Sequence, residues 1–151
     1  MEIIRRAKPE DLSRIAEILV FAKRMKYRSI FHNDDYSFNE LQVVKLVEEY
    51  GKPEILDNIW VYDDGIVKGM IHVEGKEIVE LYVDYFFWGQ GIGAKLIEFA
   101  KEERDVRFLW VLEKNTEAIQ FYKTHGFNQN GKRQPEEGTT EYVVMLERNF
   151  N

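Results

Sequence analysis

The first third of the chain shows a helical spacing of apolar residues after a short strand-like opening at residues 3–6. An apolar stripe at positions i, i+3, i+4 and i+7 begins at Leu12 and continues toward Met25. Pro9 suits a first helical position, and the two acidic residues after it suit the positive end of a helix dipole. The pattern therefore predicts a helix that begins near Pro9 and extends toward Met25.

A second helix is predicted after a polar loop. Ser37 and Glu40 form an S-x-x-E capping box, and residues 41–47 continue with apolar positions at helical spacing. Gly51 and Pro53 then indicate that this helix ends.

The period changes to that of strands from Ile59 onward. Apolar and β-branched residues fill the segments Ile59–Tyr62, Ile66–Val73 and Glu77–Val83. The dipeptides Asp64-Gly65 and Gly75-Lys76 separate these segments, and such pairs are typical of tight hairpin turns. The middle of the chain is therefore predicted to be an antiparallel meander of three strands.

The remaining elements complete a mixed sheet with helices on its faces. A helix at residues 92–103 followed by a strand at residues 106–112 implies that this strand runs parallel to the one that ends at Val83. A short helix is predicted from Thr116 to His125. The element order ends on two strands, the last at Tyr142–Leu146, and Asn128–Thr140 is expected to be a polar loop before it.

Composition restricts the class of protein. The chain has 151 residues, 44% of them apolar, which is enough for one domain with one sizeable core. With 21 basic against 27 acidic residues the net charge is -6, which disfavours nucleic acid as a partner. There is no cysteine, which excludes a thiol nucleophile and thiolate metal sites. No long apolar segment or signal sequence is evident, so we expect a cytoplasmic protein without a membrane span.

The strongest candidate for chemistry is the glycine-rich segment Trp88–Ala94, WGQGIGA, which follows a strand and opens a helix. Successive backbone N–H groups and the helix dipole converge there, which predicts an anion site. The plainer interpretation is a turn that lets a helix pack on a strand. Gly89, Gly91 and Ala94 also satisfy the dinucleotide pattern G-x-G-x-x-G/A, with Glu113 downstream as a ribose ligand. A dinucleotide-binding fold normally begins with this unit, whereas here three antiparallel strands precede it.

Two separated motifs resemble the GNAT superfamily of N-acetyltransferases. Leu81–Val83 followed by Trp88–Gly93 is similar to the family's strand and its Q/R-x-x-G-x-G/A pyrophosphate loop. Asn115–Phe127 is similar to the family's N-x-x-A-x-x-F-Y-x-x-x-G-F segment. This chain has Trp88 where the family usually has Gln or Arg, which affects the expected affinity more than the identity of the ligand.

The resemblance implies a three-layer α+β fold over residues 1–151, with a mixed, mostly antiparallel sheet of six to seven strands and about four helices. It implies acetyl-CoA as cofactor, direct attack of a primary amine on the thioester, and a small molecule or peptide as acceptor. The residues that it assigns to the cofactor are Leu81, Tyr82, Val83, Trp88, Gly89, Gln90, Gly91, Ile92, Gly93, Ala94, Asn115 and Tyr122.

Catalytic roles follow from the same resemblance, and each has a plainer alternative. Tyr122 would protonate the departing thiolate, or it is a core aromatic with its hydroxyl at the rim. Asn115 would contact coenzyme A, cap a helix, or do both. Glu77 and Glu80 are candidates for the base that deprotonates the amine, or they are solvent-facing strand residues; Glu113 is a further candidate.

Acceptor specificity in such proteins comes from two segments, here Lys26–Tyr36 and Asn128–Thr140. Their acidic residues predict attraction to a cationic amine, and these are Asp34, Asp35, Glu136 and Glu137. A non-catalytic acyl-CoA-binding module and a dinucleotide-dependent oxidoreductase remain the alternatives. A homodimer is a candidate assembly.

Two other groups of polar residues receive no functional role. The histidines His32, His72 and His125 show no metal-ligand spacing, so no metal is expected. The basic residues Lys23, Arg24, Lys26 and Arg28 are expected to form a solvated face.

Overall fold

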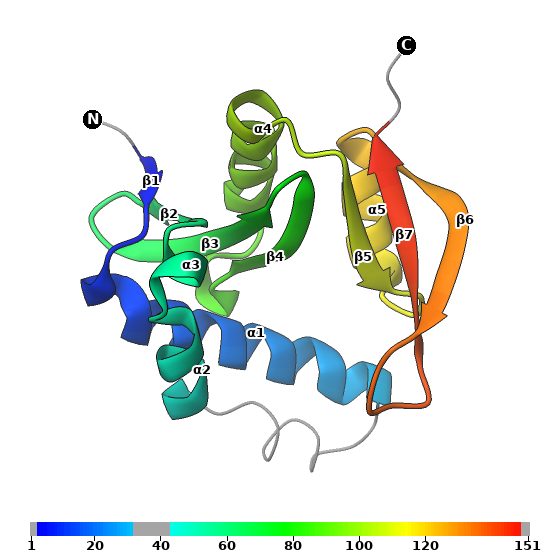
Figure 1. The fold of residues 1–151 in the computed structure, drawn as a ribbon, viewed down its shortest axis with the longest axis horizontal. Coiled ribbons are helices and arrows are strands. Elements are labelled where there is room, and N and C mark those ends of the chain that lie inside the picture. The colour runs from blue at the N-terminus through cyan, green and yellow to red at the C-terminus, as the bar shows by residue number, and fades with distance from the viewer. Residues whose placement is uncertain (1–2, 32–42, 149–151) are drawn as a thin grey trace.

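The computed structural model describes residues 3–31 and 43–148, and it has a seven-stranded sheet in the order β1-β2-β3-β4-β5-β7-β6 (Figure 1). The strands are β1 (Ile4–Arg6), β2 (Ile59–Asp63), β3 (Val67–Glu74), β4 (Glu77–Val83), β5 (Phe108–Leu112), β6 (Phe127–Pro135) and β7 (Tyr142–Arg148). The helices are α1 (Leu12–Phe31), α2 (Val43–Tyr50), α3 (Pro53–Leu56), α4 (Ile92–Arg104) and α5 (Thr116–Thr124), with 3-10 turns at Pro9–Asp11 and Tyr85–Phe87.

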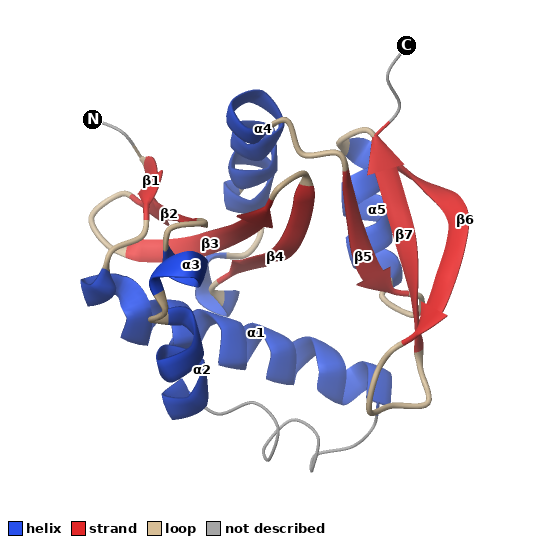
Figure 2. Cartoon of the chain, in the orientation of Figure 1, coloured by secondary structure: helices blue, strands red, loops and turns tan. Residues whose placement is uncertain are grey.

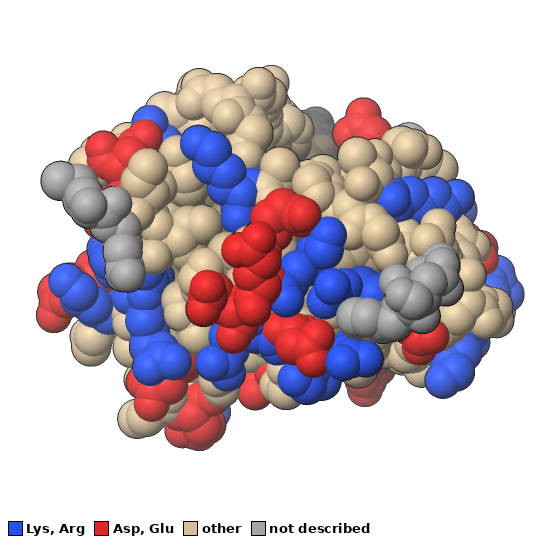
Figure 3. All heavy atoms as spheres, turned by 90° about the horizontal axis from the view of Figure 1, so that it is seen from above, with Lys and Arg blue, Asp and Glu red and all other residues tan. Residues whose placement is uncertain are grey.

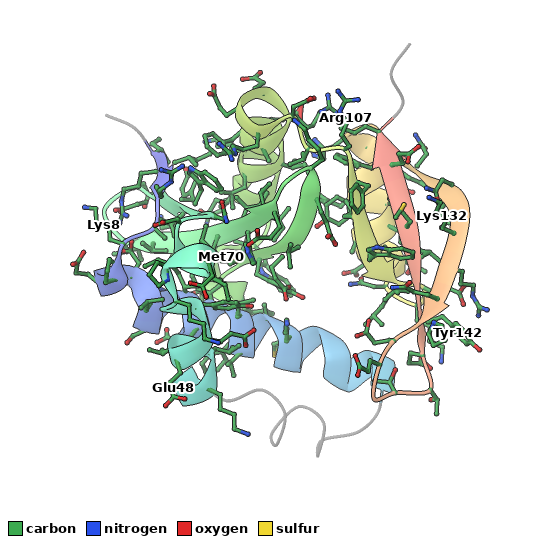
Figure 4. The ribbon with its side chains drawn as sticks, in the orientation of Figure 1. Lys8, Glu48, Met70, Arg107, Lys132 and Tyr142 are labelled. Atoms are coloured by element: carbon green, nitrogen blue, oxygen red, sulfur yellow. The ribbon has the colours of Figure 1, made fainter. Side chains whose placement is uncertain are left out.

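Helices cover both faces of the sheet, as Figure 2 shows. α4 and α5 pack on one face, where Leu96, Ile97 and Phe127 belong to the larger apolar cluster. α1, α2 and α3 pack on the other face around a second cluster that includes Ile15 and Met70. Met70 of β3 lies between the sheet and α1 (Figure 4). The predicted arrangement of a mixed sheet between two layers of helices is confirmed.

One pair of neighbouring strands is parallel, and its two strands soon separate. β4 and β5 pair only through Glu77 with Phe108 and Ile78 with Leu109, at the start of each strand. Beyond these positions the two strands diverge (Figure 1). Every other neighbouring pair in the described sheet is antiparallel. The predicted parallel crossover is therefore confirmed, and its divergence leaves the facing edges of β4 and β5 without a ladder partner.

An irregularity in β4 changes which side chains share a face. His72 of β3 pairs with Glu80, whereas the next residue, Val73, pairs with Ile78, so Val79 is an extra residue in β4. Strict alternation would place Glu77 and Glu80 on opposite faces of the sheet because they are three residues apart. The bulge at Val79 compensates for the odd spacing and turns both carboxylates to the face that α1 covers.

One prediction about the elements is wrong. The segment Asn128–Thr140 is not all loop, because its residues through Pro135 belong to β6, which pairs with β7. β6 is an edge strand that is almost wholly exposed, so its residues are polar throughout and lack the alternation that marks a strand. The predicted end of the second helix is confirmed, because α2 ends at Tyr50, and Pro53 begins the further short helix α3. The capping box of Ser37 and Glu40 lies outside the described residues.

The surface carries charges of both signs. On the face in Figure 3, acidic and basic side chains are interleaved. Among the described helices, none combines the length and the apolar character that a membrane crossing requires.

Candidate active site

A cavity of about 860 Å³ lies where β4 and β5 diverge. It extends from the loop before α4 to the middle of α1, so it reaches both helical layers. Its lining comes from residues 22–23 of α1, 77–83 of β4, 87–89 and 91–94 at the start of α4, 109–112 of β5, the inward side of α5, and Glu136. Segments that are far apart in the sequence therefore line one cavity.

The glycine-rich loop forms the end of this cavity at α4. Gly89 and Gly91 have φ values of 83° and 79°, a left-handed conformation that residues with a Cβ rarely adopt. Gly91 is the N-cap of α4 and has no side chain to bond the first amides of the helix. The N–H groups of the first turn are thereby left for a ligand, at the positive end of a helix of 13 residues.

The edge of β4 offers main-chain groups to the same cavity. Asp84 N–H donates to the Lys68 carbonyl of β3 at 2.8 Å. Because alternate residues of an antiparallel strand turn their N–H and C=O groups to opposite neighbours, Val83 and Leu81 turn theirs away from β3, into the gap beside β5. Tyr82 pairs with Met70 and turns its main-chain groups to β3. Of the three residues predicted to bind through this strand, Leu81 and Val83 present backbone groups to the cavity.

Trp88 bonds the end of β4. Its indole Nε1–H donates to the Val83 carbonyl at 2.7 Å, and its ring packs edge-on against Tyr85 at 4.9 Å between centroids. The Trp88 side chain remains 40% exposed and lines the cavity. The position at which the family usually has a polar or cationic side chain is thus occupied by an indole that bonds the protein's own backbone.

α5 contributes Asn115 and Tyr122. The Asn115 side chain accepts a hydrogen bond from Ala118 N–H at 3.2 Å, so the predicted N-cap role is confirmed. Tyr122 is 8% exposed, and its ring packs edge-on against Phe121 and Phe127. Both residues line the cavity, so the apolar body of Tyr122 belongs to the core while the residue still borders the ligand space.

Carboxylates collect at the end of the cavity near α1. Glu77, Glu80 and Glu136 all line it. Burial raises the pKa of Glu77, which the His72 charge opposes and the Glu74 charge reinforces. Burial likewise raises the pKa of Glu136. A carboxyl group with a raised pKa holds a proton more readily than an exposed one, which suits a group that must accept a proton near neutral pH.

Glu80 differs from Glu77 because it is already engaged in an ion pair. Lys23 of α1 donates from Nζ to Glu80 Oε1 at 3.0 Å, and both side chains are largely buried, at 15% and 17% exposure. The expectation that Lys23 belongs to a solvated face is wrong. Lys23 lies near the end of the apolar stripe of α1. Its side chain points toward the sheet because α1 crosses over β4 at this level.

Most of the predicted site residues come together in the cavity. All of the predicted cofactor residues except Gln90 line it, as do Glu77 and Glu80. Glu113 does not; it forms a two-point ion pair with Arg133, at 2.7 and 3.1 Å, on the exposed side of β6. That ion pair also lowers the pKa of Glu113, so the proposed base role of Glu113 has no support in the geometry.

The acceptor segments are only partly visible. Asp34 and Asp35 lie outside the described residues, and of the other two acidic candidates Glu136 lines the cavity whereas Glu137 does not. Sequence reasoning missed the inward placement of Lys23 and the contribution of Glu117 and Phe121 from α5. The spacing of Glu117 and Phe121 could have indicated both, because residues four apart lie on the same face of a helix.

Comparison with known proteins agrees with this geometry. Residues 56–129 match the family described as acetyltransferase (GNAT) domain. An uncharacterized N-acetyltransferase of Archaeoglobus fulgidus is 31% identical over 152 residues, which cover 89% of this chain and 95% of that protein. Peptidyl-lysine N-acetyltransferase YjaB of Salmonella typhimurium is 28% identical over 120 residues, or 78% of this chain and 82% of that protein.

A solved structure has the same fold. The PaiA N-acetyltransferase of Thermoplasma acidophilum, in complex with coenzyme A, superposes with a TM-score of 0.64 at 19% identity, covering 95% of this chain and 97% of that one. The fold, the glycine-rich loop and these relatives define an acyltransferase. The chain belongs to the GNAT acetyltransferase family.

Proposed function

We propose that the protein transfers the acetyl group of acetyl-CoA to a primary amine. One observation carries this proposal: the amides at the start of α4, the open edge of β4, Tyr122 and Glu77 all border a single cavity. A transfer between two substrates requires that both reach one point, and this cavity is open to both helical layers. Family membership supplies the class of reaction, and the cavity supplies the residues.

The residues of the cavity fit coenzyme A. The amides of Ile92, Gly93 and Ala94 would hold its pyrophosphate at the positive end of α4. The backbone of Leu81 and Val83 would bond the amides of its pantetheine arm, much as an added strand extends a sheet. When bound, acetyl-CoA supplies the thioester carbonyl that an amine can attack. The coenzyme A complex of the PaiA protein supports this assignment.

Glu77 and Tyr122 are the groups that we assign to proton transfer. Glu77 accepts a proton from the incoming ammonium group, whose nitrogen then attacks the thioester carbonyl carbon. As the carbon–sulfur bond breaks, Tyr122 donates its phenolic proton to the sulfur, and the second proton that leaves the nitrogen restores the phenol of Tyr122. The products are an N-acetyl amide and the thiol of coenzyme A. Glu77 is the better base of the two carboxylates because Glu80 is held by Lys23.

The acceptor that best suits this cavity is a cationic amine. Glu77, Glu80 and Glu136 line this end together with Lys23, so carboxylates outnumber cationic groups among the described lining residues. Such an end of the cavity attracts an ammonium group such as that of a lysine side chain. YjaB, whose name describes a peptidyl-lysine acetyltransferase, supports a lysine-containing peptide as the first acceptor to test.

The experiment has a binding stage and a transfer stage. Thermal melting is measured with acetyl-CoA, coenzyme A, NAD and NADP in parallel, and the two coenzyme A compounds should raise the midpoint. At a ligand concentration of 100 times Kd, the free energy of unfolding should rise by about 2.7 kcal/mol. Transfer is then measured as thiol release with lysine peptides and with neutral amines. A rise with NAD instead would favour the oxidoreductase alternative.

Replacement of Tyr122 separates an enzyme from a module that only binds acyl-CoA. Tyr122→Phe keeps the ring that packs against Phe121 and Phe127, so the apolar packing of this region should be retained. Loss of the proton donor should lower kcat about 10²- to 10⁴-fold. Binding in the wild type without any turnover above background, and with no effect of the replacement, would mean that the protein is a binding module.

A further inference from the structure

The Val83 carbonyl at the open edge of β4 accepts a hydrogen bond from a side chain of the loop that follows it. Val83 turns this carbonyl into the gap between β4 and β5, because Asp84 supplies the neighbouring bond to β3. β5 has already left β4 at this level, since the two strands pair only at Glu77 and Ile78. A backbone carbonyl in a partly enclosed gap needs a donor, and in this structure the donor is the indole of Trp88.

The loop between Val83 and Trp88 holds the indole in that position. The Asp84 carboxylate accepts from Phe86 N–H at 2.9 Å and caps the 3-10 turn Tyr85–Phe87. Arg14 of α1 forms an ion pair with the same carboxylate, which ties the loop to α1. Tyr85 then packs edge-on against the Trp88 ring. Asp84 thereby fixes the backbone at the start of the loop, and Trp88 N–H bonds the Tyr85 carbonyl at 3.3 Å, whereas the exposed Trp88 side chain can change its rotamer without moving this backbone.

We propose that Trp88 is a removable cap on the cofactor site. Its indole bonds the Val83 carbonyl in the ligand-free protein, and an amide N–H of the pantetheine arm replaces the indole when coenzyme A binds. This inference rests on the proposed function, because it assumes that the edge of β4 receives the pantetheine arm. It explains how a tryptophan can occupy the first position of the loop, because the indole donates a hydrogen bond to the Val83 carbonyl at the edge of β4 when no cofactor does so.

Competition of this kind lowers the affinity for the cofactor. Coenzyme A must break the bond between Trp88 and Val83 before it makes its own, so the net gain at that carbonyl is close to zero. Trp88→Phe keeps an aromatic ring beside Tyr85 but has no N–H to donate. We expect the Trp88→Phe protein to bind coenzyme A about fivefold more tightly than the wild type, the factor that one net hydrogen bond represents.

The first test is calorimetric titration of coenzyme A into the wild-type, Trp88→Phe and Phe86→Leu proteins. Phe86 is a matched control because it belongs to the same loop, is 83% exposed and does not line the cavity. The Phe86→Leu protein should bind as the wild type does. Equal or weaker binding by Trp88→Phe than by the wild type would overturn the cap.

The second test follows the indole directly. The chain has three tryptophans, Trp60, Trp88 and Trp110, so incorporation of 5-fluorotryptophan should give three ¹⁹F resonances, which single Phe replacements assign. Coenzyme A should shift the Trp88 resonance and leave that of Trp60, which is buried outside the cavity, in place. Binding of coenzyme A with no shift of the Trp88 resonance overturns the cap but leaves the proposed function standing. No binding to any of the three proteins overturns the proposed function, and the cap with it.

Discussion

Glu77 and Glu80 show how much two similar residues on one strand can differ. Both face the same cavity, yet Glu80 has Lys23 as an ion-pair partner, and burial raises the pKa of Glu77. Of the side chains that the structure describes, no lysine or arginine forms an ion pair with Glu77. Burial of a carboxylate without such a partner lowers the stability of the fold, which is a common property of groups that serve catalysis.

Replacement of Glu77 should therefore stabilise the protein while it slows the reaction. A raised pKa means that the folded state holds the proton more tightly than the unfolded state, so stability falls as pH rises from about the ordinary value of 4.5 through the raised pKa. Glu77→Gln removes the decrease in stability with rising pH, because glutamine does not ionise. We expect a Tm about 1–2 °C above that of the wild type at pH 7, and no difference at pH 3.5.

The matched control is Glu80→Gln, measured at the same two pH values. This replacement breaks the ion pair with Lys23, so it should not raise the Tm at pH 7. The wild-type transfer rate should depend on pH through the titration of Glu77, and the Glu77→Gln protein should lack that pH dependence. A Tm of Glu77→Gln that equals or falls below the wild-type value at pH 7 would contradict the assignment of an unfavourable buried charge.

Among the elements, the loop before α4 was the easiest to locate and the hardest to interpret. Its three glycines at residues 89, 91 and 93 predicted an anion site because their spacing suited a ligand. The structure gives them different roles: Gly89 and Gly91 are left-handed, whereas Gly93 is an ordinary helical residue whose added Cβ would meet Phe121 at 3.5 Å. Spacing alone does not separate a glycine needed for its φ angle from one needed for space.

Alanine replacements can separate these roles in the ligand-free protein. Gly91→Ala forces a Cβ into the left-handed region and should cost about 1–2 kcal/mol, or a Tm lower by about 2–8 °C. Gly93→Ala is the control, because its Cβ makes an ordinary contact and alanine favours the helix. Thermal melting of both proteins decides the matter, and an equal loss at the two positions would refute the conformational role of Gly91.

The same contrast between local and distant causes applies to the strands. The three-stranded meander from Ile59 to Val83 was predicted because its turn dipeptides and its apolar residues are local signals. The order of elements included a strand before the last one, but the range of β6 was missed, because its polar sequence has no strand signal of its own and only the pairing with β7 defines it. The bulge at Val79 was equally hidden, since it depends on the register between β3 and β4.

At the scale of the whole molecule, the sheet consists of two parts joined at a narrow seam. Strands β1 to β4 and strands β5 to β7 meet through two residue pairs between β4 and β5, and the cavity lies where they separate. A ligand in that cavity contacts both parts. Binding of coenzyme A is therefore expected to couple the two parts more strongly than the protein alone does.

Hydrogen exchange can measure this coupling. Saturating coenzyme A should slow exchange of the amides that face the cavity, namely those of Leu81, Val83 and the first turn of α4. At 100 times Kd the protection should reach up to about 100-fold where exchange requires opening of the site. The exposed outer strand β6 serves as the internal control and should change little. Equal protection of β6 and β4 would mean that coenzyme A stabilises the whole fold uniformly, which would contradict the prediction that it acts at the junction of β4 and β5.

The sequence by itself determined the elements with local signals, the glycine-rich loop, the Asn115 to Phe127 motif and the family to which the chain belongs. Each depends on residues within a few turns of one another, where spacing alone carries the information. Only the tertiary structure decided that Glu77 and Glu80 share a face, that Lys23 turns inward, that Glu113 pairs with Arg133 outside the site and that Trp88 bonds Val83. These are matters of register, helix placement and rotamer, which depend on contacts between distant segments.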